Sequence, residues 1–128
     1  MFSFFKKKDK LEKTEQKIEL SLQEMDSITE ENQQLMAKIA EAKQTDDLAK
    51  LYEKLGLNYA KLEEVDSAIE SLEKSLDYKL SIGEGYKKLM SLYNAKRAEA
   101  ARNGDDAGID KYMNKMDEMR QIAKKVKI

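Results

Sequence analysis

The sequence predicts an all-α protein made of antiparallel helical hairpins. The 128 residues include no proline, 38% of them are charged and only 7% are aromatic, a composition rich in residues that favour helices. No segment alternates apolar and polar residues for long enough to predict a strand. Apolar residues instead recur every three or four positions, as on the buried faces of packed helices. A chain of this length suits one helical domain, residues 1–128.

The first helical segment is expected in residues 11–45, after a basic and aromatic segment at residues 1–10. Glycine and proline are absent between Leu11 and Ala42, and the apolar residues alternate at steps of three and four, which is the seam of a coiled coil or a bundle helix. The seam consists of Leu11, Thr14, Ile18, Ser21, Met25, Ile28, Asn32, Leu35, Ile39 and Ala42. Because Ser27 or Thr29 can cap a new helix, one long helix and a helix pair both remain open.

The phrase "KQTDDL" begins the first predicted hairpin, at residues 46–82. Thr45 or one of the two aspartates after it can cap a helix that runs to about Leu62. Asp66 can cap the second helix, which ends before the two glycines of "SIGEG". The pattern therefore predicts two antiparallel helices joined by a short turn.

A second and longer hairpin is predicted at residues 83–128. Its first helix runs to about Arg102, and Asn103-Gly104 supplies a left-handed turn. One of the two aspartates that follow can cap the last helix. This turn is the most clearly marked helix boundary in the sequence.

Three positions recur between the hairpins at a single offset of thirty-four residues. A helix-turn-helix period of 34 residues, with an aromatic residue, a Leu-Gly pair and a tyrosine on the first helix, is typical of the tetratricopeptide repeat. The segment "DSAIESLEKSL" also resembles the start of that family's second helix. The matching positions are Tyr52, Leu55, Gly56, Tyr59, Ala68 and Leu72, and then Tyr86, Leu89 and Tyr93.

The resemblance is good over Ala49–Ile82 and degenerate from Gly83 onward. In the second unit Met90 replaces the glycine, and the family's closing proline is missing, with Leu80 in its place. Residues before Thr45 match no repeat. The resemblance therefore implies a short tetratricopeptide-like solenoid, with the N-terminal helix or helix pair as its cap.

Members of this family mostly bind peptides along the concave face formed by the first helices. The resemblance thus implies a non-enzymatic adaptor or scaffold that binds a peptide or helix of another protein. One branch of the family clamps a C-terminal carboxylate with lysine and asparagine; Glu53 and Leu57 stand at those positions here, so that clamp is not expected. Carried onto this sequence, the groove consists of Lys50, Glu53, Leu57, Ala60, Lys61, Lys87, Ser91 and Asn94.

The most specific structural prediction that follows from the resemblance concerns Gly56. Glycine inside a helix costs about 1 kcal/mol relative to alanine. In a tetratricopeptide-like hairpin the partner helix would cross close to Gly56, around Ala68 and Leu72. A larger side chain there is expected to push the two helices apart.

The composition removes most catalytic chemistry. Histidine and cysteine are absent, so the chain has no Ser-His-Asp triad, cysteine nucleophile or thiolate metal site. The acidic pairs coincide with predicted helix starts, where capping explains them. We expect no enzyme activity, no cofactor and no metal. A net charge of −1, without a basic stripe, predicts no nucleic-acid partner.

The N-terminal segment Phe2–Lys8 is too short and its charges are in the wrong order for a secretory signal. Its phenylalanines and lysines predict at most a weak, peripheral contact with an anionic membrane, and the chain is expected in the cytoplasm. An alternative function is structural self-assembly, in which Leu11–Ala42 forms a homo-oligomer seam and Phe2–Lys8 contacts a membrane.

Overall fold

The computed structural model describes residues 21–126. Over these residues every regular element is a helix, which confirms the all-α class. The helices are α2 (Ser21–Glu41), α3 (Thr45–Lys61), α4 (Val65–Tyr78), α5 (Glu84–Arg102) and α6 (Asp106–Val126). The segment Phe2–Lys8 and the seam positions Leu11, Thr14 and Ile18 lie outside the described residues.

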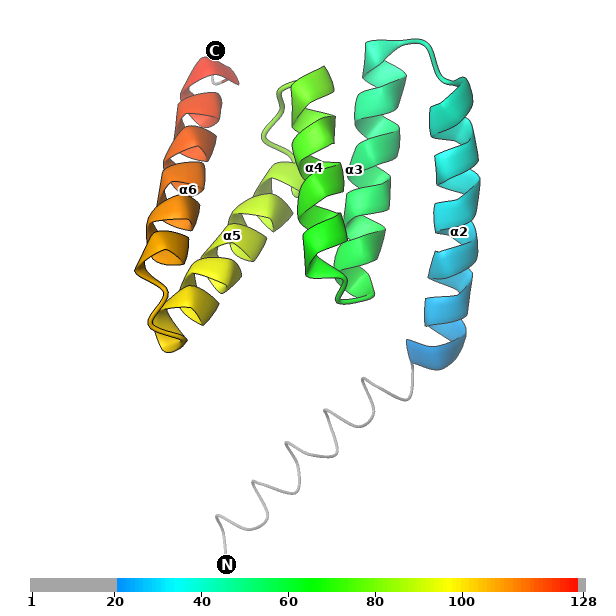
Figure 1. Ribbon diagram of the computed structural model, residues 1–128. Coiled ribbons are helices and arrows are strands. Elements are labelled where there is room, and N and C mark those ends of the chain that lie inside the picture. The colour runs from blue at the N-terminus through cyan, green and yellow to red at the C-terminus, as the bar shows by residue number, and fades with distance from the viewer. Residues whose placement is uncertain (1–20, 127–128) are drawn as a thin grey trace, which may run out of the picture.

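The helices pack as serial antiparallel neighbours. Helix α2 packs on α3, α3 on α4, α4 on α5 and α5 on α6, while α3 also contacts α5. Figure 1 shows α2 at one end of the row and α6 at the other, with α3 and α4 side by side between them. The hairpin arrangement predicted from the sequence is thereby confirmed.

Helix α2 runs without a break through the segment where a second helix could have begun. The hydroxyl of Thr29 donates a hydrogen bond to the carbonyl of Met25 at 2.8 Å, which is the bond of a residue inside a helix and not of a cap. Asn32 and Leu35 are buried, and both belong to the predicted seam. Asn32 and Leu35 of the seam therefore pack α2 against its own chain, whereas Met25 is exposed.

The turns of both hairpins close through the same pair of backbone hydrogen bonds. After α3, the amides of Glu63 and Glu64 donate to the carbonyls of Ala60 and Tyr59, at 3.0 and 2.9 Å. This is the Schellman motif, which places one residue in the left-handed region. That residue is Glu63, with φ of 60°.

After α5 the corresponding left-handed residue is Gly104, with φ of 67°. The amides of Gly104 and Asp105 donate to the carbonyls of Ala101 and Ala100. The carboxylate of Asp105 then accepts a hydrogen bond from the amide of Gly108 at 3.0 Å. The predicted Asn103-Gly104 turn and the aspartate cap of the last helix are both confirmed.

Replacing Glu63 with glycine should raise the free energy of unfolding by about 1 kcal/mol, because a side chain in the left-handed region strains the backbone. Urea unfolding of the variant and the parent chain measures the difference. Gly104→Ala is the matched control and should be destabilising by a similar amount. An unchanged or lower stability of Glu63→Gly would contradict the assignment of strain to this turn.

The starts of α3 and α4 differ from the sequence prediction. The residues that precede these helices are Gln44 and Glu64, and neither side chain makes a capping hydrogen bond. Asp46, Asp47 and Asp66 lie inside the first turns, where a carboxylate still interacts favourably with the helix dipole. Asp66 is instead bonded to Lys96 of α5, with 2.8 Å between carboxylate oxygen and ammonium nitrogen.

The Asp66–Lys96 pair makes stability depend on pH. The hydrogen bond from Lys96 and its charge hold the pKa of the Asp66 carboxyl below its ordinary value of 3.8. A lowered folded-state pKa adds stability that is complete above the ordinary pKa and is lost as the pH falls through the folded-state value. Because the Asp66 carboxylate is exposed and Lys96 is only half-buried, we expect a small effect on stability.

Asp66→Asn should therefore have a lower Tm than the parent chain at pH 6, and the gap should close as the pH falls below about 3.8. Thermal unfolding by circular dichroism at several pH values measures it. Lys96→Met should reproduce the gap at pH 6, and the double variant should add little to either change. A gap that persists at low pH would assign the loss to packing and not to the charge.

The core joins the last three helices and includes most of the predicted repeat positions. Leu55, Gly56, Ala68, Leu72, Leu89 and Tyr93 are buried, whereas Tyr52, Tyr59 and Tyr86 are half-buried. The largest cluster consists of Ile69, Leu72, Leu76, Leu89, Tyr93 and Met119. The hydroxyl of Tyr86 donates to the carbonyl of Met119 at 2.8 Å, which ties α5 to α6.

Within each hairpin the two helices approach each other most closely at one place, and that place differs between the hairpins. In the first, a Cβ atom on Gly56 would lie 2.6 Å from Cγ of Leu72, so α3 and α4 touch near the middle of α3. In the second, a Cβ atom on Gly108 would lie 2.9 Å from Cβ of Ala100, close to the turn. Figure 1 shows α5 meeting α6 at that turn and leaning away from it toward its N-terminal end.

Candidate protein-binding surfaces

The predicted groove residues lie on α3 and α5, but the structure does not gather all of them in one place. Lys50, Lys61, Lys87, Ser91 and Asn94 are exposed, and Glu53, Leu57 and Ala60 are half-buried. They divide into two depressions, described in turn below. Ala60, Lys61 and Asn94 line neither of them.

The first depression lies where α3 faces the N-terminal half of α5. It has a volume of about 280 Å³ and is lined by Leu57, Glu84, Lys87, Lys88 and Ser91. Leu57 packs against the main core cluster, so its side chain is held in place and forms an apolar floor for the depression. Two lysines at the rim favour a carboxylate beside an apolar group. We call this the α3–α5 depression.

Glu53 has a structural partner that the sequence did not reveal. Its carboxylate accepts a hydrogen bond at 3.0 Å from the amide of Gly85, in the first turn of α5. The residue before this helix is Gly83, which has no side chain for capping, so Glu53 supplies the acceptor from α3. A Cβ atom on Gly85 would lie 2.6 Å from Oε2 of Glu53, which explains the glycine.

Lys50 and Glu53 line a separate depression of about 200 Å³ with residues of α4 and the loop after it. The hydroxyl of Ser75 donates to the carbonyl of Ala49 at 2.7 Å at the base of this depression. Ala49 is the one apolar residue among its described lining residues, which include no large apolar side chain comparable to Leu57.

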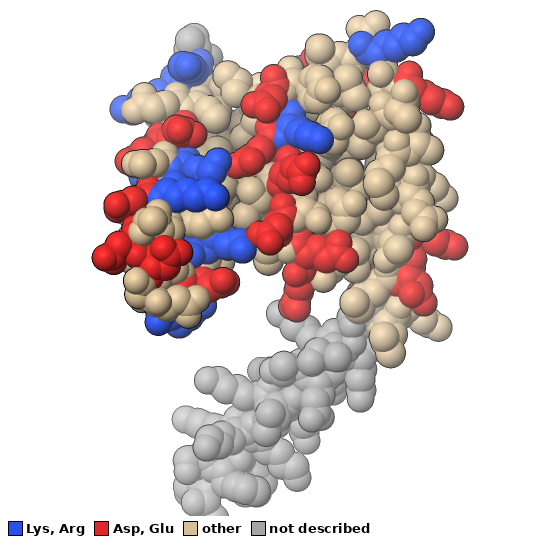
Figure 2. Space-filling view, in the orientation of Figure 1, with Lys and Arg blue, Asp and Glu red and all other residues tan. Residues whose placement is uncertain are grey.

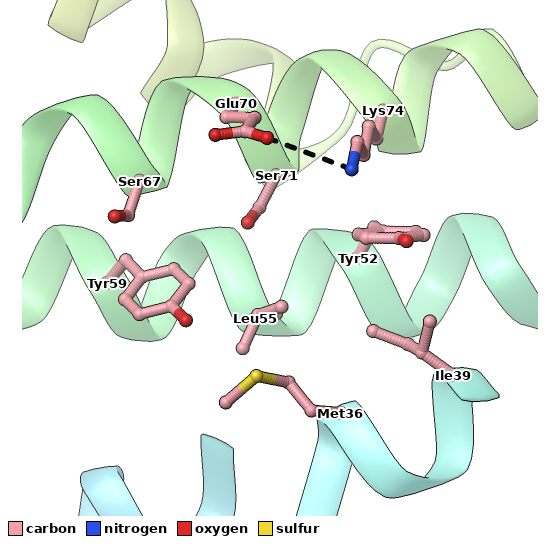
Figure 3. A pocket seen from close by; sticks show the side chains of 9 residues that line it. All are labelled: Met36, Ile39, Tyr52, Leu55, Tyr59, Ser67, Glu70, Ser71 and Lys74. Atoms are coloured by element: carbon pink, nitrogen blue, oxygen red, sulfur yellow. Dashed lines mark ion pairs between the residues drawn. The ribbon is translucent and has the colours of Figure 1, made fainter. Parts of the chain in front are cut away.

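A cleft between α2, α3 and α4 was not predicted as a site. It has a volume of about 280 Å³ and a mostly apolar floor, seen from close by in Figure 3. Met36 and Ile39 come from α2, and the ion pair of Glu70 with Lys74, at 3.7 Å, lies on the α4 rim. We call it the α2–α4 cleft. It is lined by Met36, Ile39, Tyr52, Leu55, Tyr59, Ser67, Glu70, Ser71 and Lys74.

Aromatic contacts organise the upper part of this cleft. The ring of Tyr52 stacks on that of Tyr78, with centroids 5.7 Å apart. The ammonium nitrogen of Lys74 lies 5.4 Å from the centroid of Tyr52, within the range of a cation–π contact. Tyr52, one of the predicted repeat positions, thus also lines the cleft and is half-buried.

An equivalent cleft of about 260 Å³ lies between α4, α5 and α6. Leu55 and Tyr59 of the first cleft correspond to Leu89 and Tyr93 of the second, thirty-four residues later. The α4 and α6 residues also correspond one by one, at a constant 48 positions. These pairs are Ser67 with Lys115, Glu70 with Glu118, Ser71 with Met119 and Lys74 with Ile122.

A hydrogen-bond network connects side chains that line the second cleft. The hydroxyl of Tyr93 donates to the carboxylate of Glu73, and Lys115 donates to the same oxygen at 3.0 Å. Burial and the neighbouring Glu73 raise the pKa of Tyr93, so this hydroxyl stays protonated and acts as a donor. The network links α4, α5 and α6.

A buried amide network fixes α2 to α3. The amide nitrogen of Asn58, a residue only 1% exposed, donates to Asn32 at 2.9 Å and to Glu31 at 2.6 Å. The hydrogen bond from Asn58 and the charge of Lys54 lower the pKa of Glu31. Asn32 is a polar position of the predicted seam, and Asn58 is its buried hydrogen-bond partner.

No group of three histidine, cysteine or acidic side chains gathers as a metal site within residues 21–126. Over the same residues, no helix is long and apolar enough to cross a membrane. Comparisons with protein-family models, with curated proteins and with solved structures gave no match to this chain.

Proposed function

We propose that this chain is a non-enzymatic interaction module that binds a segment of another protein in the α3–α5 depression. The observation that carries the proposal is the meeting of Leu57, Lys87 and Ser91 around one hollow. All three belong to the groove implied by the resemblance to tetratricopeptide repeats. The serial hairpins and the corresponding positions of the two clefts support a short repeat stack of that kind.

The chemistry of the depression defines the partner segment. A half-buried leucine floor accepts one apolar side chain, and burying it gives about 1.5–3 kcal/mol. Lys87 and Lys88 at the rim favour a carboxylate next to that side chain, while Glu84 disfavours a second one. The expected ligand is therefore a short segment with one apolar residue beside an acidic residue.

A display experiment with random peptides tests this function without naming the partner in advance. Peptides selected on the full chain are then measured against Leu57→Glu/Lys87→Glu, which adds charge to the floor and reverses the rim. We expect selected peptides to carry an apolar residue beside Asp or Glu. Their affinity for the double variant should fall at least tenfold, because each change removes about 1 kcal/mol or more.

Lys79→Glu/Leu80→Glu is the matched control, since it makes the same exchanges at an exposed leucine and lysine outside the depression. Peptides that bind the parent chain and the α3–α5 variant equally would remove this surface as the binding site. Circular dichroism of each variant verifies that the helices are intact.

Self-assembly remains a second proposal, because the N-terminal end of α2 leaves apolar side chains uncovered. Leu22 is 71% exposed and Met25 37% exposed, whereas Asn32 and Leu35 further along are buried within the chain. A homo-oligomer would therefore use the N-terminal end of α2, which includes the seam position Met25. Sedimentation of the full chain and of Leu22→Glu/Met25→Glu tests it: a monomer in both cases at high concentration excludes the seam dimer.

A further inference from the structure

The α2–α4 cleft has the size and the lining of a site for an aromatic side chain. A cavity of about 150 Å³ lined by apolar residues accommodates benzene, and this cleft holds about 280 Å³. One wall is apolar and adaptable. Met36 is 45% exposed, and a methionine side chain can adjust its shape to an irregular partner. Tyr52 and Tyr59 of α3 lie between this wall and α4, and their rings offer edges and faces to another ring.

The cleft is bordered by a strongly acidic helix. Between Glu63 and Tyr78 the chain carries six carboxylates and a single lysine, Lys74. All of these carboxylates are exposed except the half-buried Glu73. Figure 2 shows acidic side chains gathered in a column over α4, beside an uncharged surface toward α2. A ligand that places rings in the cleft and positive charges over α4 would match both features.

The first ten residues of the chain have this composition. All three phenylalanines of the protein, Phe2, Phe4 and Phe5, stand there, followed at once by Lys6, Lys7 and Lys8. We propose that this N-terminal segment binds its own molecule, with a phenylalanine ring in the α2–α4 cleft and the lysines over the acidic surface of α4. The segment would cover the apolar wall that α2 presents at the end of the helix row.

The chain is long enough for this contact. Phe5 precedes Ser21 by sixteen residues, and Met36 follows Ser21 by fifteen. Fifteen helical residues rise about 22 Å along α2, and sixteen extended residues span up to about 55 Å. The contact therefore requires the residues between Phe5 and Ser21 to leave the helix that the sequence predicts from Leu11, because a continuous helix would carry the segment away from the cleft. A tether of this length gives an effective concentration near the millimolar range, which favours the same molecule over a second copy at micromolar protein.

Disulfide trapping in the full chain tests the proposal, because the protein has no cysteine of its own. The pair Phe4→Cys with Met36→Cys joins the segment to the cleft. The control pair, Phe4→Cys with Met113→Cys, uses a methionine on α6 of nearly the same exposure, 49% against 45%. We expect the Met36 pair to close at least ~10-fold faster than the control, as a monomeric species on a non-reducing gel.

Charge variants in the same background separate docking from random collision. Glu63→Lys/Glu70→Lys should slow the closure toward the control rate, and so should high salt, which screens exposed charges. Glu99→Lys/Asp110→Lys, which changes the same number of exposed carboxylates away from the cleft, should leave the rate unchanged. Circular dichroism of each variant verifies the fold.

Three results would overturn the proposal. Equal closure rates for the two cysteine pairs would remove the cleft as the site. A dimeric disulfide product would assign the segment to a second copy. If vesicles containing phosphatidylserine bind the parent chain and Phe4→Ala/Phe5→Ala abolishes that binding, while the trapping rates stay equal, the segment contacts membranes and not the cleft.

Discussion

Gly56→Leu is expected to lower the free energy of unfolding by about 1–3 kcal/mol, because it adds a side chain where two helices already touch. A Cβ atom at Gly56 would lie 2.6 and 2.7 Å from two side-chain carbons of Leu72. It would also lie 3.1 Å from the backbone nitrogen of Leu72. Rotation of the leucine relieves the first contacts but not the backbone contact, so α3 and α4 have to separate.

Urea unfolding followed by circular dichroism measures this loss. Gly56→Ala should be destabilising in the same direction but less so, since it adds one carbon. In the Gly56→Ala background, Leu72→Ala should lower the free energy of unfolding by less than it does in the parent chain, because residues 56 and 72 compete for one space. Ala101→Leu, at an exposed position of α5, is the control and should change stability by less than about 0.5 kcal/mol. An unchanged stability of Gly56→Leu would mean that the close crossing is wrong.

Local signals in the sequence were enough to predict the helices and the turns between the hairpins. The turn at Asn103-Gly104 and the cap at Asp105 can be recognised from the residue types alone, since glycine tolerates the left-handed region and aspartate caps a helix. The close crossing at Gly56 was expected from the resemblance to tetratricopeptide repeats, together with the cost of a glycine in a helix interior. At the turn, by contrast, the residue types themselves indicate the backbone conformation without reference to tertiary contacts.

The surfaces were harder to predict, because they depend on which side chains meet across helices. Glu53 reaches the amide of Gly85 across 32 residues, and Asn58 reaches Asn32 across 26. Neither side chain differs locally from an ordinary polar residue on a helix. The α2–α4 cleft was missed for the same reason: its walls come from three separate helices, and Tyr52 and Tyr59 serve both packing and surface.

The shape of the second hairpin shows how one substitution in a repeat is accommodated. Met90, where the first hairpin has Gly56, packs half-buried against the main core cluster. The close approach has moved toward the turn, where Ala100 and Gly108 are small enough to meet. The longer α5 and α6 thus diverge where the methionine needs room. The sequence predicted that this hairpin would differ but not where its helices would touch.

Leu89→Ala is expected to cost about 2–5 kcal/mol, the range for removing a large side chain from a well-packed core. Leu89 is fully buried, at 0% exposure, within the cluster that joins α4, α5 and α6. Its neighbours come from three helices that are also held by the Tyr93–Glu73–Lys115 network. The site has little freedom to collapse around a cavity, so we expect a value in the upper half of the range.

Such a loss is a large fraction of the 5–15 kcal/mol that stabilises a typical domain, and urea unfolding of both chains measures it. Leu80→Ala is the control, because that leucine is 43% exposed and its truncation should change stability by less than about 0.5 kcal/mol. If Leu89→Ala were as mild as the control, the three helices would not share one core. If instead a probe on α3 and a probe on α6 report the same unfolding midpoint in the variant, the two hairpins unfold as one unit, since α4 contacts both α3 and α5.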